Sequence, residues 1–542
     1  MENADALQTR VPDERLESWK EIGSYLNRDV RTVERWERTR GMPVHRLPGG
    51  EKARVYALKP ELDAWRSSRD ANLRETDATS SVLASIAVLP FANLSDDKEN
   101  EYFSDGLAED IINALATLPG LRVVARTSAF AFRGKNATAA EIGARLKVTT
   151  ILEGSVRKSG NRFRVTAQLI RTSDQSHLWQ ERYDREMTDL FAIQDEISHA
   201  IVEKLRVRLI GDEPLVKPYT ENLEAYSLFL RGRHCIHKVT PESLAKGKEY
   251  LDQAIALDAD NALAYSALAE YYWANLMWDC TMPGSEAIPQ AKTAALTAVQ
   301  LDDTLAEAHA QLGSAKGIGD FDWVGAEREF RRALELNPAS AIVHYYYGLN
   351  CLRPMGRLEE ELAIAQRAVE LDPLSPRYSS CLGYIYSLAG EFNPAIEQCR
   401  RAMDLAPDMY QPHFMIAATY QHADRIEESV AEYKKSYELS GRNVRVAGAL
   451  AYACGLARRQ GEVRALLKQL IIQCRKTYVP AFAMLSAYLG TGEFDQAFEW
   501  LEKAVDERDL MVVCHLKLEP SWSIFRRNPR YQALLRKMNL EL

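Results

Sequence analysis

Basic side chains recur at helical spacing near the beginning of the sequence, in the stretch RDVRTVERWERTR. Arg31, Arg35 and Arg38 are three or four residues apart, so a helix would place them, together with Thr32, on one outward stripe. Guanidinium groups in such a stripe can donate hydrogen bonds to phosphates and to base edges. The spacing therefore predicts an anion-binding helix, and nucleic acid is the polymer that suits it.

Two local elements are expected to position that stripe. Trp19, Ile22 and Leu26 have the spacing of one amphipathic helix, and Asp29 is a good N-cap for the second helix, which carries the arginines. A short turn joins the two helices. This arrangement is a helix-turn-helix, whose second helix has the size of a DNA major groove.

A hairpin is predicted directly after the second helix. Gly49 and Gly50 separate two short extended runs in HRLPGGEKARVYAL, as expected for a wing that brings Arg46, Lys52 and Arg54 to its surface. A further helix follows, and its apolar residues, together with those of the second helix, are expected to close a small core: Val33, Trp36, Leu62 and Trp65.

Residues 15–69 hold thirteen Lys and Arg against eight Asp and Glu, a local net charge of +5 in a chain of formal net charge −8. A basic module in an acidic chain suits contact with phosphates. Arg31, Thr32 and Arg35 are expected to enter the groove. The phosphate-binding residues are expected to be Lys20, Arg28, Arg38, Arg46, Lys52 and Arg54.

The segment DVRTVERWERTRGMPV resembles the recognition segment of MerR-type and excisionase-type winged helix-turn-helix domains. In those domains VRT at the start of the second helix precedes an aromatic residue and a glycine-containing turn. The resemblance covers about 55 residues and implies double-stranded DNA as a partner. The long dimerising coiled coil of MerR proteins does not follow here. A solvated arginine face without a ligand is the alternative.

The next region, residues 85–211, follows a predicted polar linker at 70–84 and alternates strand-like runs with helices. Apolar Leu107, Ile111 and Leu115 mark one helical face, with Ser104 and Asp105 as capping candidates. Three strands are expected across TTILEGSVRKSGNRFRVTAQLIRTSDQSHLWQERYDRE, before a helix at about 189–209. The pattern predicts an α/β domain with a mixed sheet.

Several phrases of this region resemble the TolB amino-terminal-like domain: IAVLPFANLS, EYFSDGLAEDIINAL, LRVVARTSAFAFRGK and ILEGSVRKSG. The resemblance implies a sensory or accessory module. The glycines and cations here have neither the spacing of a phosphate loop nor that of a dinucleotide site, and His177 has no nearby nucleophile. No catalytic, cofactor-binding or metal-binding residues are therefore expected, and the chain is not expected to be an enzyme.

The last region repeats itself. RRALELNP, QRAVELDP, RRAMDLAP and KKSYELSG place Leu336, Leu371, Leu405 and Leu439 at separations of 35, 34 and 34 residues. A period of about 34 resembles that of the tetratricopeptide repeat. Seven or eight helix pairs are expected over residues 221–509, stacked into an all-α superhelix with a concave face, and residues 510–542 are expected to cap its last apolar face. Such an array is typically a surface for a protein partner or for self-association.

The composition, with 46% apolar and 27% charged residues, is typical of globular domains. No signal peptide or membrane-spanning run is found, and the eight cysteines form no CxxC pair, so a bacterial cytoplasmic protein without membrane contact is expected. The sequence thus predicts a DNA-binding transcriptional regulator. Two alternatives stay open: a scaffold whose helix-turn-helix docks a protein, and an accessory subunit of a nucleotide cyclase or kinase.

Overall fold

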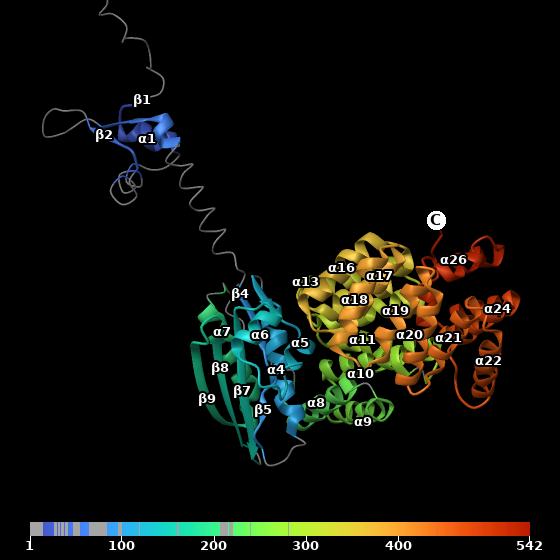
Figure 1. Ribbon diagram of the computed structural model, residues 1–542. Coiled ribbons are helices and arrows are strands. Elements are labelled where there is room, and N and C mark those ends of the chain that lie inside the picture. The colour runs from blue at the N-terminus through green and yellow to red at the C-terminus, as the bar shows by residue number, and fades with distance from the viewer. Residues whose placement is uncertain are drawn as a thin grey trace, which may run out of the picture. The chain divides into compact units, whose positions relative to one another are not determined.

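The computed structural model forms two compact units, Met1–Leu83 and Ala84–Leu542, and each has a hydrophobic core of its own (Figure 1). The residues that it describes are 15–26, 30, 33, 37, 42–46, 55–63, 84–95, 100–118, 120–159, 162–205, 207, 215, 220–238, 240–279 and 281–541.

The first unit contains a small antiparallel sheet and short helical segments. Strands β1 (Arg15–Leu16) and β2 (His45–Arg46) both pair with β3 (Val55–Leu58), which gives the order β1-β3-β2. Helix α1 (Trp19–Tyr25) begins at Ser18, whose hydroxyl accepts a hydrogen bond from the Glu21 amide. The predicted first helix and the two strands of the predicted hairpin are therefore present, whereas β1 was not expected.

The core of this unit follows the amphipathic pattern of the sequence. Ile22, Val33 and Leu62 are fully buried, and Leu16 and Met42 pack with them. The other two residues expected in this core, Trp36 and Trp65, lie outside the described residues. Most of the predicted second helix also lies outside them, so the winged helix-turn-helix as a whole stays a prediction.

The second unit begins with a mixed six-stranded sheet of order β6-β4-β7-β8-β9, in which β5 also pairs with β7. Strand β4 is parallel to both β6 and β7, whereas β7, β8 and β9 are antiparallel neighbours. The mixed sheet and its three long strands agree with the sequence pattern. The strands are β4 (Ala84–Val88), β5 (Ala92–Asn93), β6 (Leu121–Val123), β7 (Thr150–Ser159), β8 (Arg162–Arg171) and β9 (His177–Glu186).

Four helices accompany this sheet: α4 (Glu101–Ala116), α5 (Arg126–Phe130), α6 (Ala139–Leu146) and α7 (Leu190–Leu205). Helix α4 starts at Asn100, about one turn before the predicted cap. Ser104 and Asp105 are consequently buried inside the helix and do not cap it, so that prediction was wrong.

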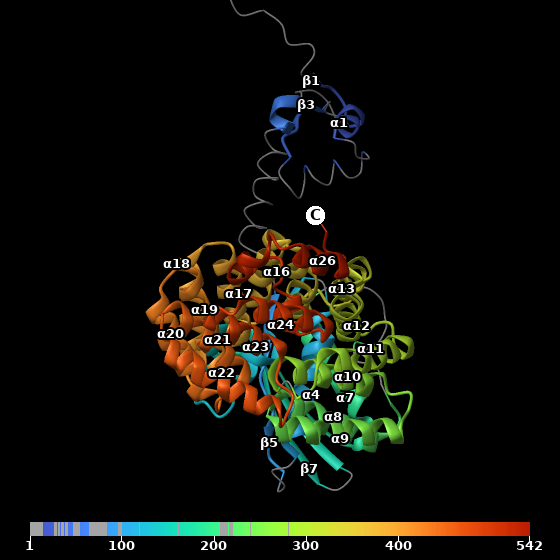
Figure 2. The same ribbon diagram turned by 90° about the vertical axis from the view of Figure 1, so that its right-hand side faces the viewer.

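Eight helix pairs follow in the described part of residues 223–506, and Figure 2 shows them succeeding one another around the molecule. Every leucine of the predicted repeat is the last residue of a second helix, which confirms the helical period. The first and second helices of the pairs are α8 (Leu223–Lys238) and α9 (Pro241–Leu257); α10 (Ala262–Ala274) and α11 (Gly284–Leu301); α12 (Ala306–Ser314) and α13 (Trp323–Leu336); α14 (Ala341–Tyr347), continued by α15 (Arg353–Met355), and α16 (Leu358–Leu371); α17 (Pro376–Leu388) and α18 (Phe392–Leu405); α19 (Tyr410–His422) and α20 (Ile426–Leu439); α21 (Val444–Leu456) and α22 (Gln460–Cys474); α23 (Ala481–Thr491) and α24 (Phe494–Asp506).

The chain after the last pair does more than cap it. Helices α25 (Leu510–Val513) and α26 (Pro529–Lys537) and the turn η6 (Pro520–Phe525) carry buried side chains that pack against several earlier pairs. The Ser285 amide of α11 donates to the Glu507 carbonyl at 2.8 Å, and the Trp323 indole donates to the Met538 carbonyl at 2.6 Å. The end of the array therefore returns to its second and third pairs.

Candidate DNA interface and the contacts that hold the repeats

Two of the nine predicted DNA-contacting residues are described, and both are exposed. Lys20 lies on α1 and Arg46 ends β2. The Arg46 guanidinium donates to Glu37 Oε1 at 2.8 Å, while its side chain keeps 54% of its surface exposed. Water screens an ion pair whose arginine is exposed in this way, so the pair contributes little to stability. A phosphate can therefore replace Glu37 as the partner of Arg46 at little cost.

The predicted wing has its two strands in antiparallel register, with His45 opposite Tyr56 and Arg46 opposite Val55. The His45 ring stacks on Tyr56 with the ring centroids 5.0 Å apart. The remaining predicted contact residues lie outside the described residues and stay predictions: Arg28, Arg31, Thr32, Arg35, Arg38, Lys52 and Arg54.

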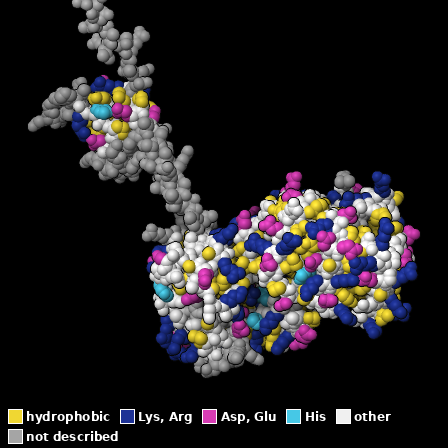
Figure 3. All heavy atoms as spheres, in the orientation of Figure 1, with side chains coloured by type: hydrophobic (Ala, Val, Ile, Leu, Met, Phe, Trp, Pro, Cys, Tyr) yellow, Lys and Arg dark blue, Asp and Glu magenta, His cyan; other side chains and the backbone are white. Residues whose placement is uncertain are grey.

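The face of the repeats that is visible in Figure 3 carries charged side chains of both signs. Figure 3 shows Lys and Arg side chains intermingled with Asp and Glu over that face. A mixed surface gives no extended positive field for a polyanion.

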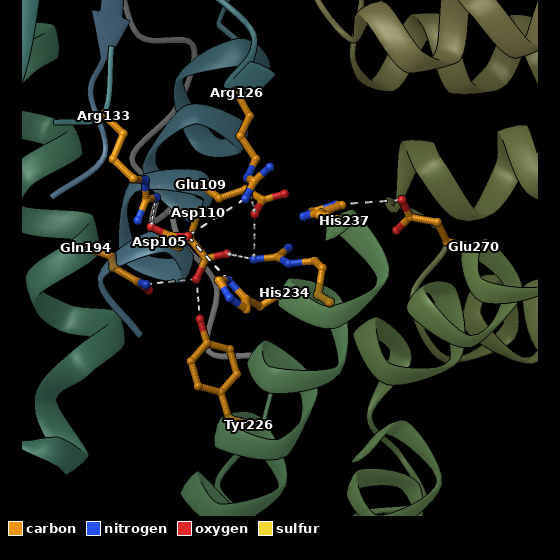
Figure 4. Close-up of polar contacts among 11 residues, drawn as sticks. Asp105, Glu109, Asp110, Arg126, Arg133, Gln194, Tyr226, His234, His237 and Glu270 are labelled. Carbon is orange, nitrogen blue, oxygen red and sulfur yellow. Dashed lines mark hydrogen bonds and ion pairs between the residues drawn. The ribbon is translucent and has the colours of Figure 1, made fainter. Parts of the chain in front are cut away.

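A polar contact joins the sheet region to the repeats, and Figure 4 shows it. Helix α4 presents Asp105 and Glu109, which are one helical turn apart, and Asp110, which follows Glu109 directly. The groups that meet these carboxylates come from α5 and its following turn, from α7 and from α8. They are Arg126, Arg133, Gln194, Tyr226, Arg233 and His234.

Arg233 of α8 is the link between two of these carboxylates. Its Nη2 lies 3.5 Å from Glu109 Oε2 and 3.4 Å from Asp110 Oδ1, and its side chain is only 11% exposed. The Tyr226 hydroxyl donates to Asp110, and the Gln194 amide donates to the same carboxylate oxygen at 2.9 Å. Since α8 belongs to the first helix pair, these bonds attach the repeats to α4.

Burial sets the direction of the pKa shift at three groups of this contact, whereas the pKa values of Asp105 and Glu109 are lowered by their basic partners against the effect of burial. Burial raises the pKa of Asp110, against the opposing charge of Arg233 and the hydroxyl of Tyr226. Burial also lowers the pKa of His237 to about 3 and raises that of Glu270 to about 7. His237 and Glu270 are 3.7 Å apart, but a neutral imidazole beside a partly protonated carboxyl forms a polar contact and not an ion pair.

A second contact joins the sheet region to the end of α16. The Ser128 amide donates to Asp372 Oδ1 at 2.9 Å, its hydroxyl donates to the same oxygen, and the Leu374 amide donates back to Ser128 Oγ at 2.7 Å. Burial raises the pKa of Asp372 to about 6, while the bonds from Ser128 oppose that rise. The two contacts involve the first and the fourth helix pairs, so the sheet region is held to the array at separate points.

The C-terminal residues occupy the inner side of the array. The buried Arg353 donates to Glu361 Oε1 at 2.7 Å and to the His515 imidazole at 2.9 Å. Burial lowers the pKa of His515 to about 3, so its ring is neutral. Its Nδ1 then donates to the Met511 carbonyl at 2.8 Å, and its Nε2 accepts from Arg353.

Next to this contact lies a cavity of about 110 Å³, bounded by first helices of the repeats and by the C-terminal residues. The sequence predicted an open concave face with a cap at its end. In the structure, the Tyr384 hydroxyl donates to Glu519 at 2.6 Å, and His422 contacts the same carboxylate at 3.0 Å. The chain's own C-terminal segment therefore covers part of the inner face, which differs from the expected cap.

These polar contacts were not among the features that the sequence predicted. One signal was available, because SDGLAEDII places three acids close together on a helix that also carries the apolar face. Their basic partners in RGRHCIH lie more than a hundred residues later, and no local pattern pairs the two stretches. Among the described residues, no group of three or more His, Cys, Asp and Glu residues is placed to hold a metal ion.

Residues 82–200 match the second domain of HilA/YgeH-like transcriptional regulators. The chain is also 31% identical over 152 residues to the transcriptional regulator HilA of Salmonella typhimurium, and these cover 28% of this chain and 27% of HilA. A protein of Rhizobium meliloti named "Putative adenylate cyclase 3" is 37% identical over 235 residues, which cover 43% of this chain and 40% of that protein. The similarity thus spans less than half of each relative.

Solved structures similar to this chain include YrrB, a TPR protein with an unusual peptide-binding site, at 18% identity with a TM-score of 0.25. PilF of Pseudomonas aeruginosa is 20% identical with a TM-score of 0.31. They cover 35% and 44% of this chain, and 91% and 97% of their own chains. In the described part of this chain, no helix is long and apolar enough to cross a membrane. The match over residues 82–200 shows that the sheet region is similar to a domain of transcriptional regulators. A region of helix pairs follows it in the chain.

Proposed function

We propose that this protein is a DNA-binding transcriptional regulator. The observation that carries the proposal is the match of residues 82–200 to the second domain of HilA/YgeH-like regulators. Residues 15–69, with a net charge of +5, precede that match, and an exposed arginine ends one strand of the antiparallel β2–β3 pair. Position and charge together favour DNA as the ligand of the first unit.

Each region has a role in this proposal. Residues 15–69 form a MerR- or excisionase-like winged helix-turn-helix, in which Arg31, Thr32 and Arg35 read the major groove. Residues 85–211 form a TolB-like module that senses or relays a signal. Residues 221–509 form a tetratricopeptide array that binds a protein partner. The protein acts in the bacterial cytoplasm, without a cofactor and without catalysing a reaction.

Capture of genomic fragments by the purified full-length protein at two salt concentrations tests this function. Discrete enriched sites are expected, with weaker capture at the higher salt concentration because phosphate contacts release counterions. The double variant R31A/R35A is expected to lose the sites. R332A/R367A is the matched control, since it removes two exposed arginines of the repeats and changes the net charge equally. Loss in both variants, or capture insensitive to salt, contradicts the proposal and favours a protein-docking scaffold.

A second function is favoured by the similarity to the relative named as an adenylate cyclase. In this alternative, the chain is an accessory subunit that changes the activity of a nucleotide cyclase supplied by another protein. Cyclic AMP production by a purified bacterial cyclase, measured with and without the full chain, tests it. A rate that changes with the amount of chain added supports the accessory function, and an unchanged rate contradicts it.

A further inference from the structure

Strand β9 lies at the edge of the six-stranded sheet. Among the described strands it pairs only with β8, and Figure 1 shows it on the side of the sheet away from the repeats. An edge strand presents a row of backbone N–H and C=O groups on which a further strand can form. At ten residues, His177–Glu186 is long for an edge that a protein leaves bare.

The second half of β9 is regular enough to accept a partner. The one irregularity in its pairing with β8 lies at its beginning, between Leu169 and Ile170 of β8. From Trp179 to Glu186 each residue of β9 has one partner in register. This part contains one buried side chain, Tyr183, which is 3% exposed. The charged side chains of the edge are half-buried or exposed.

The charges along QERYDRE, residues 180–186, are complementary to those of a second, antiparallel copy of the same stretch. If Tyr183 lies opposite Tyr183 of a second antiparallel copy, Arg182 faces Asp184 of that copy. Glu181 then faces Arg185 of that copy in the same way. Cross-strand pairs of opposite charge stabilise an antiparallel ladder. The two-fold symmetry makes each of these pairs occur twice.

Neighbouring registers lack this property. A shift by one residue in one direction places Glu181 opposite Asp184, and in the other direction it places Arg182 opposite Arg185. A shift by two places Arg182 or Asp184 opposite itself. Like charges directly opposite each other destabilise a strand pair. Of these five registers, the one centred on Tyr183 is the one in which every pair of facing charges is opposite in sign.

We propose that β9 pairs antiparallel with β9 of a second copy of this chain, about a two-fold axis at Tyr183, so that the two sheets form one continuous sheet. Edge strands that avoid association commonly carry charged side chains such as Lys, and charges of a single sign repel a second copy. The mixed signs of β9 do the reverse. Because strand pairing buries little surface, the association is expected to be reversible and dependent on concentration.

Charge reversal at one facing pair tests the proposal. Sedimentation of the full-length protein is expected to show dimers. E181R and R185E each place like charges opposite one another twice, so each is expected to weaken dimerisation about tenfold or more. A mixture of the two variants restores both opposite-charge pairs in a heterodimer, and so does the double variant E181R/R185E. R332E is the control, since it reverses an exposed charge on α13, away from β9.

Each outcome decides the question. Two weakened single variants that dimerise when mixed support the strand pairing, because a folding defect would not be repaired by mixing. Circular dichroism of each variant checks that the fold is intact. A monomeric parent protein, single variants that dimerise like the parent, or a mixture that stays monomeric overturns the proposal. These measurements contain no DNA, so failure here is separate from failure of the proposed function.

Discussion

The two units of the molecule use the same kind of ion pair in opposite surroundings. In the first unit, Arg46 lies 2.8 Å from Glu37, and the two side chains are 54% and 17% exposed. In the second unit, Arg353 donates to Glu361 at 2.7 Å, and the exposed fractions are 2% and 1%. The distances are nearly equal. The exposure of the side chains is what separates the two pairs.

The difference in exposure changes what each ion pair contributes to its unit. Water screens the exposed pair, so its arginine can exchange a carboxylate for another anion. The buried pair is shielded from water, so removal of either partner leaves an uncompensated charge in the core. In the first unit Arg46 therefore remains exposed to solvent, whereas in the repeats Arg353 holds the C-terminal residue His515 in place.

The largest predicted effect on stability comes from breaking the buried ion pair of Arg353 and Glu361. E361Q leaves the buried Arg353 without its counter-charge and is expected to lower the free energy of unfolding by about 3–5 kcal/mol. Its neighbour offers a matched control, because Glu360 pairs with Arg357 at 2.6 Å but is 57% exposed. E360Q is expected to lower the free energy of unfolding far less, because water screens the exposed pair. Urea unfolding measures both, and equal costs would show that exposure does not distinguish the pairs.

The next largest effect is the pH dependence of stability caused by Asp372, the buried carboxyl at the second contact between the sheet region and the repeats. Burial raises the pKa of Asp372 from 3.8 to about 6, against the bonds from Ser128 and the charge of Arg377. The folded protein thus holds this proton up to a higher pH than the unfolded chain does. The stabilisation from Asp372 is present at low pH and is lost as the pH rises from about 4 to about 6, by roughly 3 kcal/mol.

D372N is expected to remove that loss, because asparagine stays neutral and its oxygen still accepts from Ser128. Unfolding free energies between about pH 4 and pH 7 should then fall less steeply in D372N than in the parent protein. The exposed Asp404 supplies the control variant D404N, for which the parental pH dependence is expected. The same steep fall in D372N would exclude Asp372 as its source.

A smaller effect on stability is expected when a closely packed glycine and an exposed glycine of the repeats are each replaced by alanine. A Cβ atom at Gly448 of α21 would lie 2.4 Å from the carbonyl oxygen of Ala483 in α23, whereas a Cβ at Gly461 would meet no atom within 4 Å. G448A is expected to cost about 1–3 kcal/mol by overpacking. G461A is expected to be neutral or to stabilise α22 by up to about 1 kcal/mol, since alanine favours helix. Thermal unfolding that shifts equally in both variants would contradict the close approach of the two helices.

The smallest effect on stability is expected in the first unit. K20A and R46A should each leave the free energy of unfolding nearly unchanged, because both side chains are exposed. If the side chain binds a phosphate, its removal should lower the slope of log K against log salt by about 0.9. Fluorescence anisotropy on a captured fragment measures that slope. An unchanged slope would remove the residue from the DNA interface.

Much of the secondary structure could be predicted because its signals are local. Leu336 and Leu371 end their helices as the 34-residue period predicted, and the three long strands of the mixed sheet lie in the stretch where three strands were predicted. The N-terminal boundary of α4 was misjudged by one turn, because Ser104 and Asp105 have the composition of a cap. In the structure, the bonds to Asp105 come from other elements, and a local pattern contains no information about them.

The sequence by itself determined the order of the three kinds of region, the helical period and the basic character of residues 15–69, because these depend on the local sequence alone. Tertiary structure decided which charges became buried. Asp110 meets Tyr226 across 116 residues, and Arg353 meets His515 across 162 residues. Such pairs form only once packing has removed both partners from water, and no spacing along the chain encodes that step.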